Sequence, residues 1–115
     1  MRNLNIDERL KDDVMILDLS GDITIGENSR ILREEIRKLL GQGQKRILLN
    51  MDEVAYVDSS GLGEIVSDFG AVSRDGGELK LLNLTEHFQD IITITKLLTV
   101  FDCFENEDEA VRSFW

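Results

Sequence analysis

The segment Val57-Asp-Ser-Ser-Gly-Leu-Gly63 holds the side chains best placed to do chemistry. It joins the end of an apolar run to the start of an amphipathic helical pattern, so Ser59 stands at a helix entrance. A hydroxyl there is exposed and lies in the field of the helix N-terminus. A phosphate added to it would change the surface charge without disturbing a core. The segment therefore predicts a protein-binding switch at Ser59.

A simpler interpretation is that a serine of this segment only caps the helix. Either Ser59 or Ser60 could accept a hydrogen bond from a free amide of the first turn. One serine is enough for a cap, so the pair leaves a second hydroxyl free. Gly61 and Gly63 lack side chains and are expected to leave open space beside it.

Catalytic, nucleotide and metal chemistry are not supported by the pattern. The turn is not Gly-x-Ser-x-Gly, and the only histidine, His87, is expected on the surface of another helix. Gly61-Leu-Gly63 lacks the lysine of a phosphate loop. Cys103 and His87 supply too few soft ligands for zinc, and the thiol is expected to pack as a small apolar group. We expect no enzyme activity, no cofactor and no bound metal.

Composition indicates one domain, residues 1–115, in which 42% of the residues are hydrophobic. The single cysteine forms no internal bridge, and the chain has no run of 18 apolar residues, so a soluble, cytoplasmic protein is expected. The net charge of −10 opposes binding to nucleic acid or to an anionic membrane surface.

Hydrophobic periodicity predicts alternating strands and helices. The expected strands are 4–10, 14–19 (ended by Gly21), 46–51, 78–84 and 99–104. The expected helices are 24–40, 62–72, 85–94 and 106–115. Thr24 and Glu27 have capping-box spacing at the start of the first helix, and the β-branched residues of 85–94 also suit a strand. This order predicts an α/β fold with a mixed four- to five-stranded sheet and helices packed mainly on one face.

Three motifs resemble those of the STAS domain, and in particular those of the bacterial anti-sigma factor antagonists. They are Val57-Asp-Ser-Ser-Gly-Leu-Gly63 after the strand Ile47-Leu-Leu-Asn50, Leu17-Asp-Leu-Ser-Gly-Asp-Ile-Thr24, and Gly76-Gly-Glu-Leu-Lys-Leu-Leu-Asn83. The resemblance implies that the unphosphorylated protein binds an anti-sigma factor and frees a sigma factor. That anti-sigma factor would itself be a serine kinase of the histidine-kinase-like ATPase fold and would phosphorylate Ser59. A metal-dependent serine phosphatase would restore the first form.

The resemblance also implies a partner-binding surface around Ser59 on a monomer or dimer. Its expected members are Asp22, Thr24, Asp58, Ser59, Ser60, Gly61, Leu62 and Gly63. Many relatives carry an acidic residue where this chain has Thr24, so the local electrostatics differ there. The alternative function is a non-catalytic STAS subunit of a larger stress-signalling or transport assembly.

Overall fold

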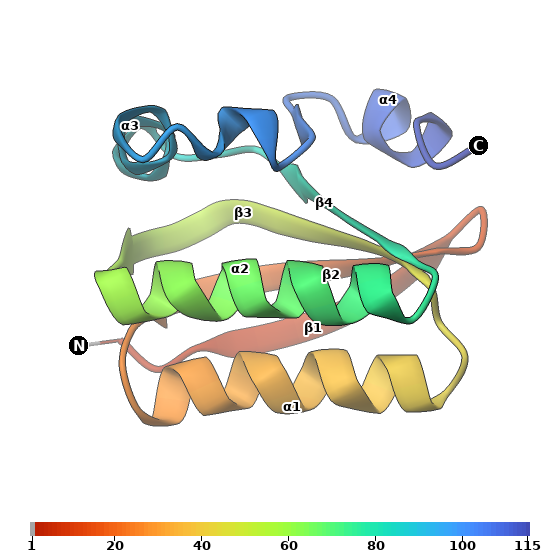
Figure 1. Cartoon of the computed structure of the whole chain (residues 1–115), viewed down its shortest axis with the longest axis horizontal. Helices are drawn as coiled ribbons and strands as arrows, with labels where there is room; N and C mark the ends of the chain where they lie inside the picture. The colour runs from red at the N-terminus through yellow and green to blue at the C-terminus, as the bar shows by residue number, and fades with distance from the viewer. Residues whose placement is uncertain (1) are drawn as a thin grey trace.

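The computed structural model of the chain describes residues 2–115 as a single layered α/β unit (Figure 1). Its strands are β1 (Asn5–Lys11), β2 (Val14–Ile23), β3 (Arg46–Val57), β4 (Glu78–Leu82) and β5 (Cys103–Phe104). Its helices are α1 (Glu27–Gly41), α2 (Ser59–Arg74), α3 (Glu86–Ile94), α4 (Glu107–Arg112) and a 3₁₀ turn, η1 (Leu97–Thr99).

The sheet has the strand order β1-β2-β3-β4-β5. β1 and β2 form an antiparallel hairpin, and all later neighbours are parallel. The mixed sheet predicted from the sequence is therefore confirmed, with five strands. Because β2, β3 and β4 run the same way, the loops that follow them meet at one edge of the sheet.

Helices α1, α2 and α3 contribute to the main core, and α4 packs on the opposite face. Leu32 and Ile36 of α1 and Ile65 of α2 have no exposed surface, and they join inward-facing residues of the central strands. A smaller cluster beneath α4 contains Val111 and Leu48. Leu48 lies in β3 between Ile47 and Leu49, which belong to the main core. Successive residues of β3 thus serve opposite faces, which explains its continuous apolar run.

Two strands extend further than expected. Gly21 was predicted to end β2, but β2 continues to Ile23, and Gly21 has φ +109°. A side chain there would put its Cβ 2.1 Å from the Asn3 carbonyl oxygen, so the glycine permits a close backbone crossing. β3 continues past Met51 to Val57, but its register with β2 shifts twice, which removes the simple alternation.

The helix starts also differ from prediction. α1 begins at Glu27, and its N-cap is Gly26 with no side-chain bond, so the predicted capping box at Thr24 is wrong. α2 begins at Ser59 rather than near Leu62. α3 is helical despite its β-branched residues, and Thr85 caps it by accepting from the Phe88 amide. No helix within residues 2–115 is long and apolar enough to cross a membrane.

Two carboxyl groups of α2 are buried against α1. Glu64 contacts Arg33 across the helix pair at 3.3 Å, and Asp68, one turn further on, is 3% exposed. Burial, and after it the adjacent Glu64 carboxyl, raise the pKa of Asp68 to about 9, and the positive charges of Arg33 and Arg37 offset only part of this. Asp68 is therefore a neutral acid in the folded protein at pH 7.

The raised pKa makes stability depend on pH. The native state keeps a proton on Asp68 that the unfolded chain loses above about pH 4, so the free energy of unfolding falls as pH rises from about 4 to about 9. We expect Asp68→Asn to remove this fall, which reaches at most about 1.4 kcal/mol per pH unit. Urea denaturation at pH 5, 6.5 and 8 measures the difference. Asp90→Asn, at an exposed site, is the control. Parallel pH profiles for wild type and Asp68→Asn would contradict the assignment.

Candidate functional site

The candidate site is the turn between β3 and α2, at the edge where the parallel strands end. In Figure 1 this edge lies at the left, with the first turn of α2, the loop from β2 into α1 and the N-terminal end of the chain. The turn is short: β3 ends at Val57, Asp58 follows, and Ser59 is the first residue of α2. The sequence motif therefore falls at the strand-to-helix junction that was expected.

Asp58, and not a serine, caps α2. Its Oδ1 accepts a hydrogen bond from the Gly61 amide at 2.7 Å, and its Oδ2 accepts one from the Ile25 amide at 3.0 Å. The Asp58 amide in turn donates to the Ile23 carbonyl at 3.2 Å. The carboxylate thus satisfies a free amide of the helix and also joins the helix to the preceding loop.

Ser59 and Ser60 are left without a capping role. Both residues are exposed. In the part of the chain that the structure describes, neither hydroxyl has a hydrogen-bond partner, because Asp58 occupies the position that one of them was expected to fill. The interpretation of a serine cap is therefore wrong, and two hydroxyls face solvent at the positive end of a helix dipole.

The two glycines of the turn have opposite surroundings. A Cβ on Gly61 would lie 1.9 Å from the Ile23 carbonyl oxygen, so Gly61 lets the helix rest directly on β2. A Cβ on Gly63 would meet no atom within 4 Å. The open space expected beside both glycines exists only at Gly63, which leaves the outer surface of the first turn free.

Asp22 and Thr24, which were expected on the partner surface, lie beneath it. Asp22 is 7% exposed and its Oδ2 accepts from the Arg2 amide at 2.8 Å. Thr24 is 2% exposed, and its carbonyl oxygen accepts from both the amide and the hydroxyl of Ser29. The residue at position 24 therefore influences the Ser59 turn through the loop it holds.

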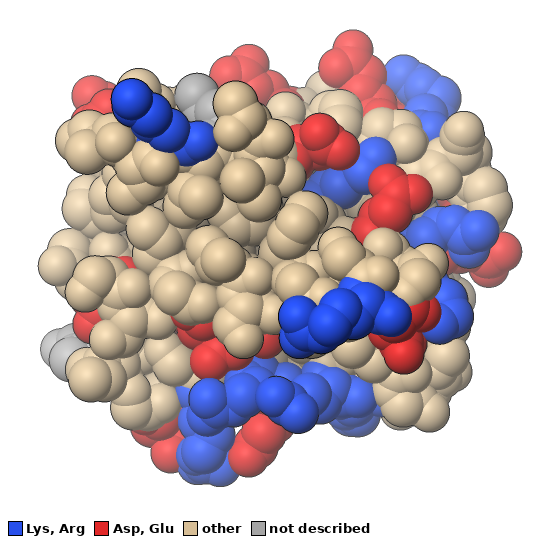
Figure 2. All heavy atoms as spheres, viewed as in Figure 1, with Lys and Arg blue, Asp and Glu red and all other residues tan. Residues whose placement is uncertain are grey.

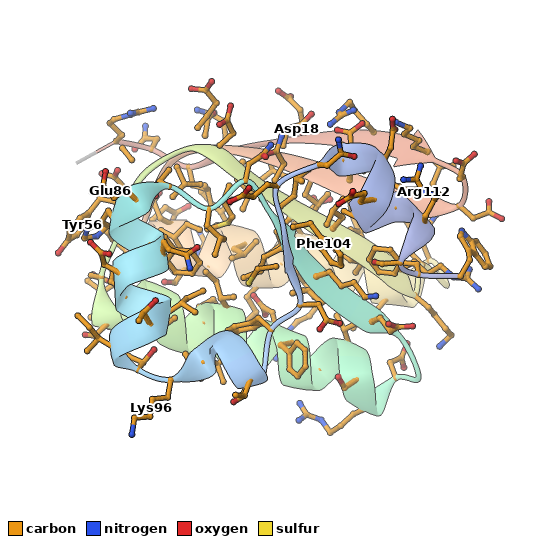
Figure 3. All side chains as sticks on the ribbon, turned by 90° about the horizontal axis from the view of Figure 1, so that it is seen from above. Asp18, Tyr56, Glu86, Lys96, Phe104 and Arg112 are labelled. Carbon is orange, nitrogen blue, oxygen red and sulfur yellow. The ribbon has the colours of Figure 1, made fainter. Side chains whose placement is uncertain are left out.

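Sequence reasoning missed an apolar rim around the turn. Ile25 is 67% exposed in the loop after β2, and Leu62 is half-buried in the first turn of α2. Tyr56, near the end of β3, stacks on His87 of α3 with ring centroids 5.1 Å apart. Tyr56 and Glu86 lie together at one end of the molecule in Figure 3. The signal for this rim was weak, because single apolar residues at the surface are common.

Charge is unevenly distributed on the face formed by α1 and α2. Uncharged side chains cover most of the left half of the view in Figure 2, over the first turns of α2, whereas Lys and Arg side chains gather over α1. An uncharged patch beside an exposed serine suits contact with another protein better than contact with a free ion. No group of three or more His, Cys, Asp or Glu residues within 2–115 could hold a metal.

Cys103 lies apart from this turn. Its thiol is half-buried against the main core, as expected for a small apolar group. Burial, and to a lesser degree the charge of Asp102, raise the pKa of the Cys103 thiol to about 11. The thiol is therefore protonated at neutral pH and unreactive.

Comparison with known proteins places this chain in a family. The model of the STAS domain matches residues 5–110. The chain is 31% identical over 110 residues to the anti-sigma-B factor antagonist of Bacillus subtilis, covering 96% of this chain and 99% of that protein. The crystal structure of a candidate anti-sigma factor antagonist from Thermotoga maritima superposes with a TM-score of 0.87 at 25% identity, covering 95% of this chain and 93% of that one. The phosphorylated form of the Bacillus cell fate determinant SpoIIAA shares the fold, with a TM-score of 0.72 at 19% identity over 96% of this chain and 97% of that one.

The contrast between the two glycines can be tested with one pair of substitutions. Gly61→Ala should lower the free energy of unfolding by about 1–3 kcal/mol, because its methyl group meets the Ile23 carbonyl. Gly63→Ala should raise it by about 0.5–1 kcal/mol, because alanine favours the helix and the space is open. Chemical denaturation measures both. Equal effects of the two substitutions would contradict the packing described for the turn.

Proposed function

Because this chain belongs to the STAS domain family, we propose that it is an anti-sigma factor antagonist switched at Ser59. Its unphosphorylated form binds an anti-sigma factor and thereby releases a sigma factor for transcription. Phosphorylation of Ser59 ends that binding. The family resemblance supplies the partner classes: an anti-sigma factor that is also a serine kinase of the histidine-kinase-like ATPase fold, and a metal-dependent serine phosphatase.

The observation that carries this proposal is the unused hydroxyl of Ser59. Asp58 takes the capping role, so the exposed Ser59 side chain can accept a phosphoryl group without loss of a structural hydrogen bond. Ile65, six residues after Ser59 in α2, is fully buried and holds the helix on the sheet. A modification at Ser59 therefore acts on a fixed surface and not on the fold.

The charge change is large for so small a surface. A phosphate adds about −1.5 to −2 charge beside the Asp58 carboxylate on a protein that already carries −10. Burying that charge against a partner without new cations costs several kcal/mol. A partner that closes over the uncharged patch of the unphosphorylated form is therefore released.

The partner surface that we propose has two layers. Ser59, Ser60 and Gly63 are exposed and can touch a partner, and Leu62 adds a half-buried apolar group. The second layer positions the first: it comprises Asp58, Gly61, Asp22 and Thr24. The exposed Ile25 and Tyr56 extend the apolar part of the contact.

In this function the chain is a substrate and a binding protein, not an enzyme, and it acts in the cytoplasm, where sigma factors act. A non-catalytic subunit of a larger stress-signalling or transport assembly would use the same fold. Size distinguishes the two, because a switch protein should be a small monomer or dimer and a subunit should enter a large particle.

Incubation of the purified protein with ATP alone should give neither ATP turnover nor self-labelling.

The switch is tested by copurification from the source cell. We expect Ser59→Ala to retain an ATPase-fold partner and Ser59→Asp to lose it, since only the second adds charge at the contact. Recovery of the partner with Ser59→Asp should be at least tenfold lower than with Ser59→Ala, as measured by quantitative mass spectrometry of the captured proteins. Treatment of the wild-type complex with ATP should release the partner and label Ser59.

A matched control separates position from charge. Ser67→Asp adds the same charge to an exposed serine two turns further along α2 and should retain the partner. Equal recovery by Ser59→Ala and Ser59→Asp would remove the switch hypothesis. Loss of the partner from Ser67→Asp as well would show that net charge, and not the turn, controls binding.

A further inference from the structure

The N-terminal segment of the chain is fastened beside the Ser59 turn by one buried side chain, that of Asn28. Asn28 is the second residue of α1 and is 5% exposed. Its Oδ1 accepts from the Leu4 amide at 3.1 Å, and its Nδ2 donates to the Arg2 carbonyl at 2.9 Å and to the Thr24 hydroxyl at 3.4 Å. Both ends of the carboxamide are therefore occupied.

Only a carboxamide suits this position. The site presents one N–H, of Leu4, and two oxygens, of Arg2 and Thr24, within reach of one side chain, and asparagine offers both an acceptor and a donor. Asparagine is a poorer helix former than alanine, and a buried amide is costly unless it is hydrogen-bonded. The presence of asparagine at position 28 is therefore explained by its bonds to the N-terminal segment and to Thr24, and not by a preference of α1 for asparagine.

The bonds continue from Asn28 to the Ser59 turn. Ser29 follows Asn28 in α1, and its hydroxyl donates a hydrogen bond to the Thr24 carbonyl oxygen at 2.7 Å. The amide of Ile25 donates to Asp58, and Asp58 caps the helix that starts with Ser59. A path of hydrogen bonds and adjacent backbone thus runs from the N-terminal segment through Thr24, Ile25 and Asp58 to Ser59.

Asp22 strengthens the same fastening from the strand side. Its Oδ2 accepts from the Arg2 amide, and its own amide donates to the Arg2 carbonyl at 3.3 Å. Gly21 lets this segment cross close to β2. Figure 1 shows the N-terminal end at the same edge as the loop into α1 and the start of α2.

We propose that Asn28 is a positioning residue for the Ser59 site: it fixes the N-terminal segment against the loop after β2, and that loop holds the Asp58 carboxylate that presents Ser59. This inference rests on the proposed function. Its consequence is that the docking surface is ordered before a kinase binds. Loosening the loop adds an ordering cost to binding and leaves the phosphoryl transfer itself unchanged.

Two substitutions test the role. Asn28→Ala removes all three bonds. Asn28→Asp keeps the size and one acceptor but loses both donors, and a carboxylate in the first turn favours the helix dipole, so this variant keeps α1 folded. Asn106→Ala is the control, because it removes one asparagine bond, to the Glu109 amide, at the distant α4.

The first readout needs no kinase. In both Asn28 variants the Ile25 and Gly61 amides should exchange hydrogen at least fivefold faster than in wild type, as measured by NMR, while the Leu49 amide in the central strand is unchanged. The control should match wild type at all three amides. Wild-type exchange at Ile25 and Gly61 in both variants would overturn the inference.

The second readout uses the kinase fraction recovered with the wild-type chain and radiolabelled ATP. The KM for each Asn28 variant should rise about five- to tenfold. The phosphorylation rate at saturating concentrations of the variant should stay within twofold of wild type. A merely structural role would lower the saturating rate through loss of folded protein and leave KM unchanged, and that result would overturn the inference alone. Absence of Ser59 labelling in wild type would instead overturn the proposed function, and with it the positioning role, whatever the exchange rates show.

Discussion

The geometry of the Ser59 turn depends on the hydrogen bonds that the Asp58 carboxylate accepts. This carboxylate accepts one amide from its own helix and one from the loop after β2, at 2.7 and 3.0 Å. Bonds to an ionised acceptor are stronger than neutral ones, and a side-chain cap contributes about 1–2 kcal/mol to helix stability. One side chain therefore fixes the start of α2, fixes the neighbouring loop and leaves the two following hydroxyls unused.

The scaffold beneath the turn makes this arrangement rigid. Gly61 brings the helix backbone into contact with the Ile23 carbonyl, and fully buried Ile65 and Val72 hold the rest of α2 on the sheet. Well-packed interiors resist small displacements. The outer surface of the same turn is different, because Gly63 is open and Ile25 is exposed. The site thus combines a fixed base with an accessible face.

Sequence periodicity was sufficient for the α/β fold and the order of its main elements, although the expected strand 99–104 is a strand only at Cys103–Phe104. It could not identify the cap, because Asp58, Ser59 and Ser60 are consecutive and aspartate and serine are both good caps. Gly21 was misread as the end of β2, since a glycine that stops a strand and one that permits a close crossing have the same letter. The burial of Thr24 left no local pattern, because it goes with contacts between distant parts of the sequence: Asn28 bonds to both the Arg2 carbonyl and the Thr24 hydroxyl.

For the proposed switch, the location of Ser59 decides how a phosphate can act. At the N-terminus of α2 the helix dipole favours a negative charge by about 0.3–1 kcal/mol, so the modified turn has no reason to unfold. Enclosing the same charge in a contact that offers no cation costs several kcal/mol. Each 1.4 kcal/mol changes an affinity tenfold, so the second effect outweighs the first by orders of magnitude in the binding constant. A serine at a well-capped helix start therefore allows a phosphate to control association while the fold that presents it stays the same.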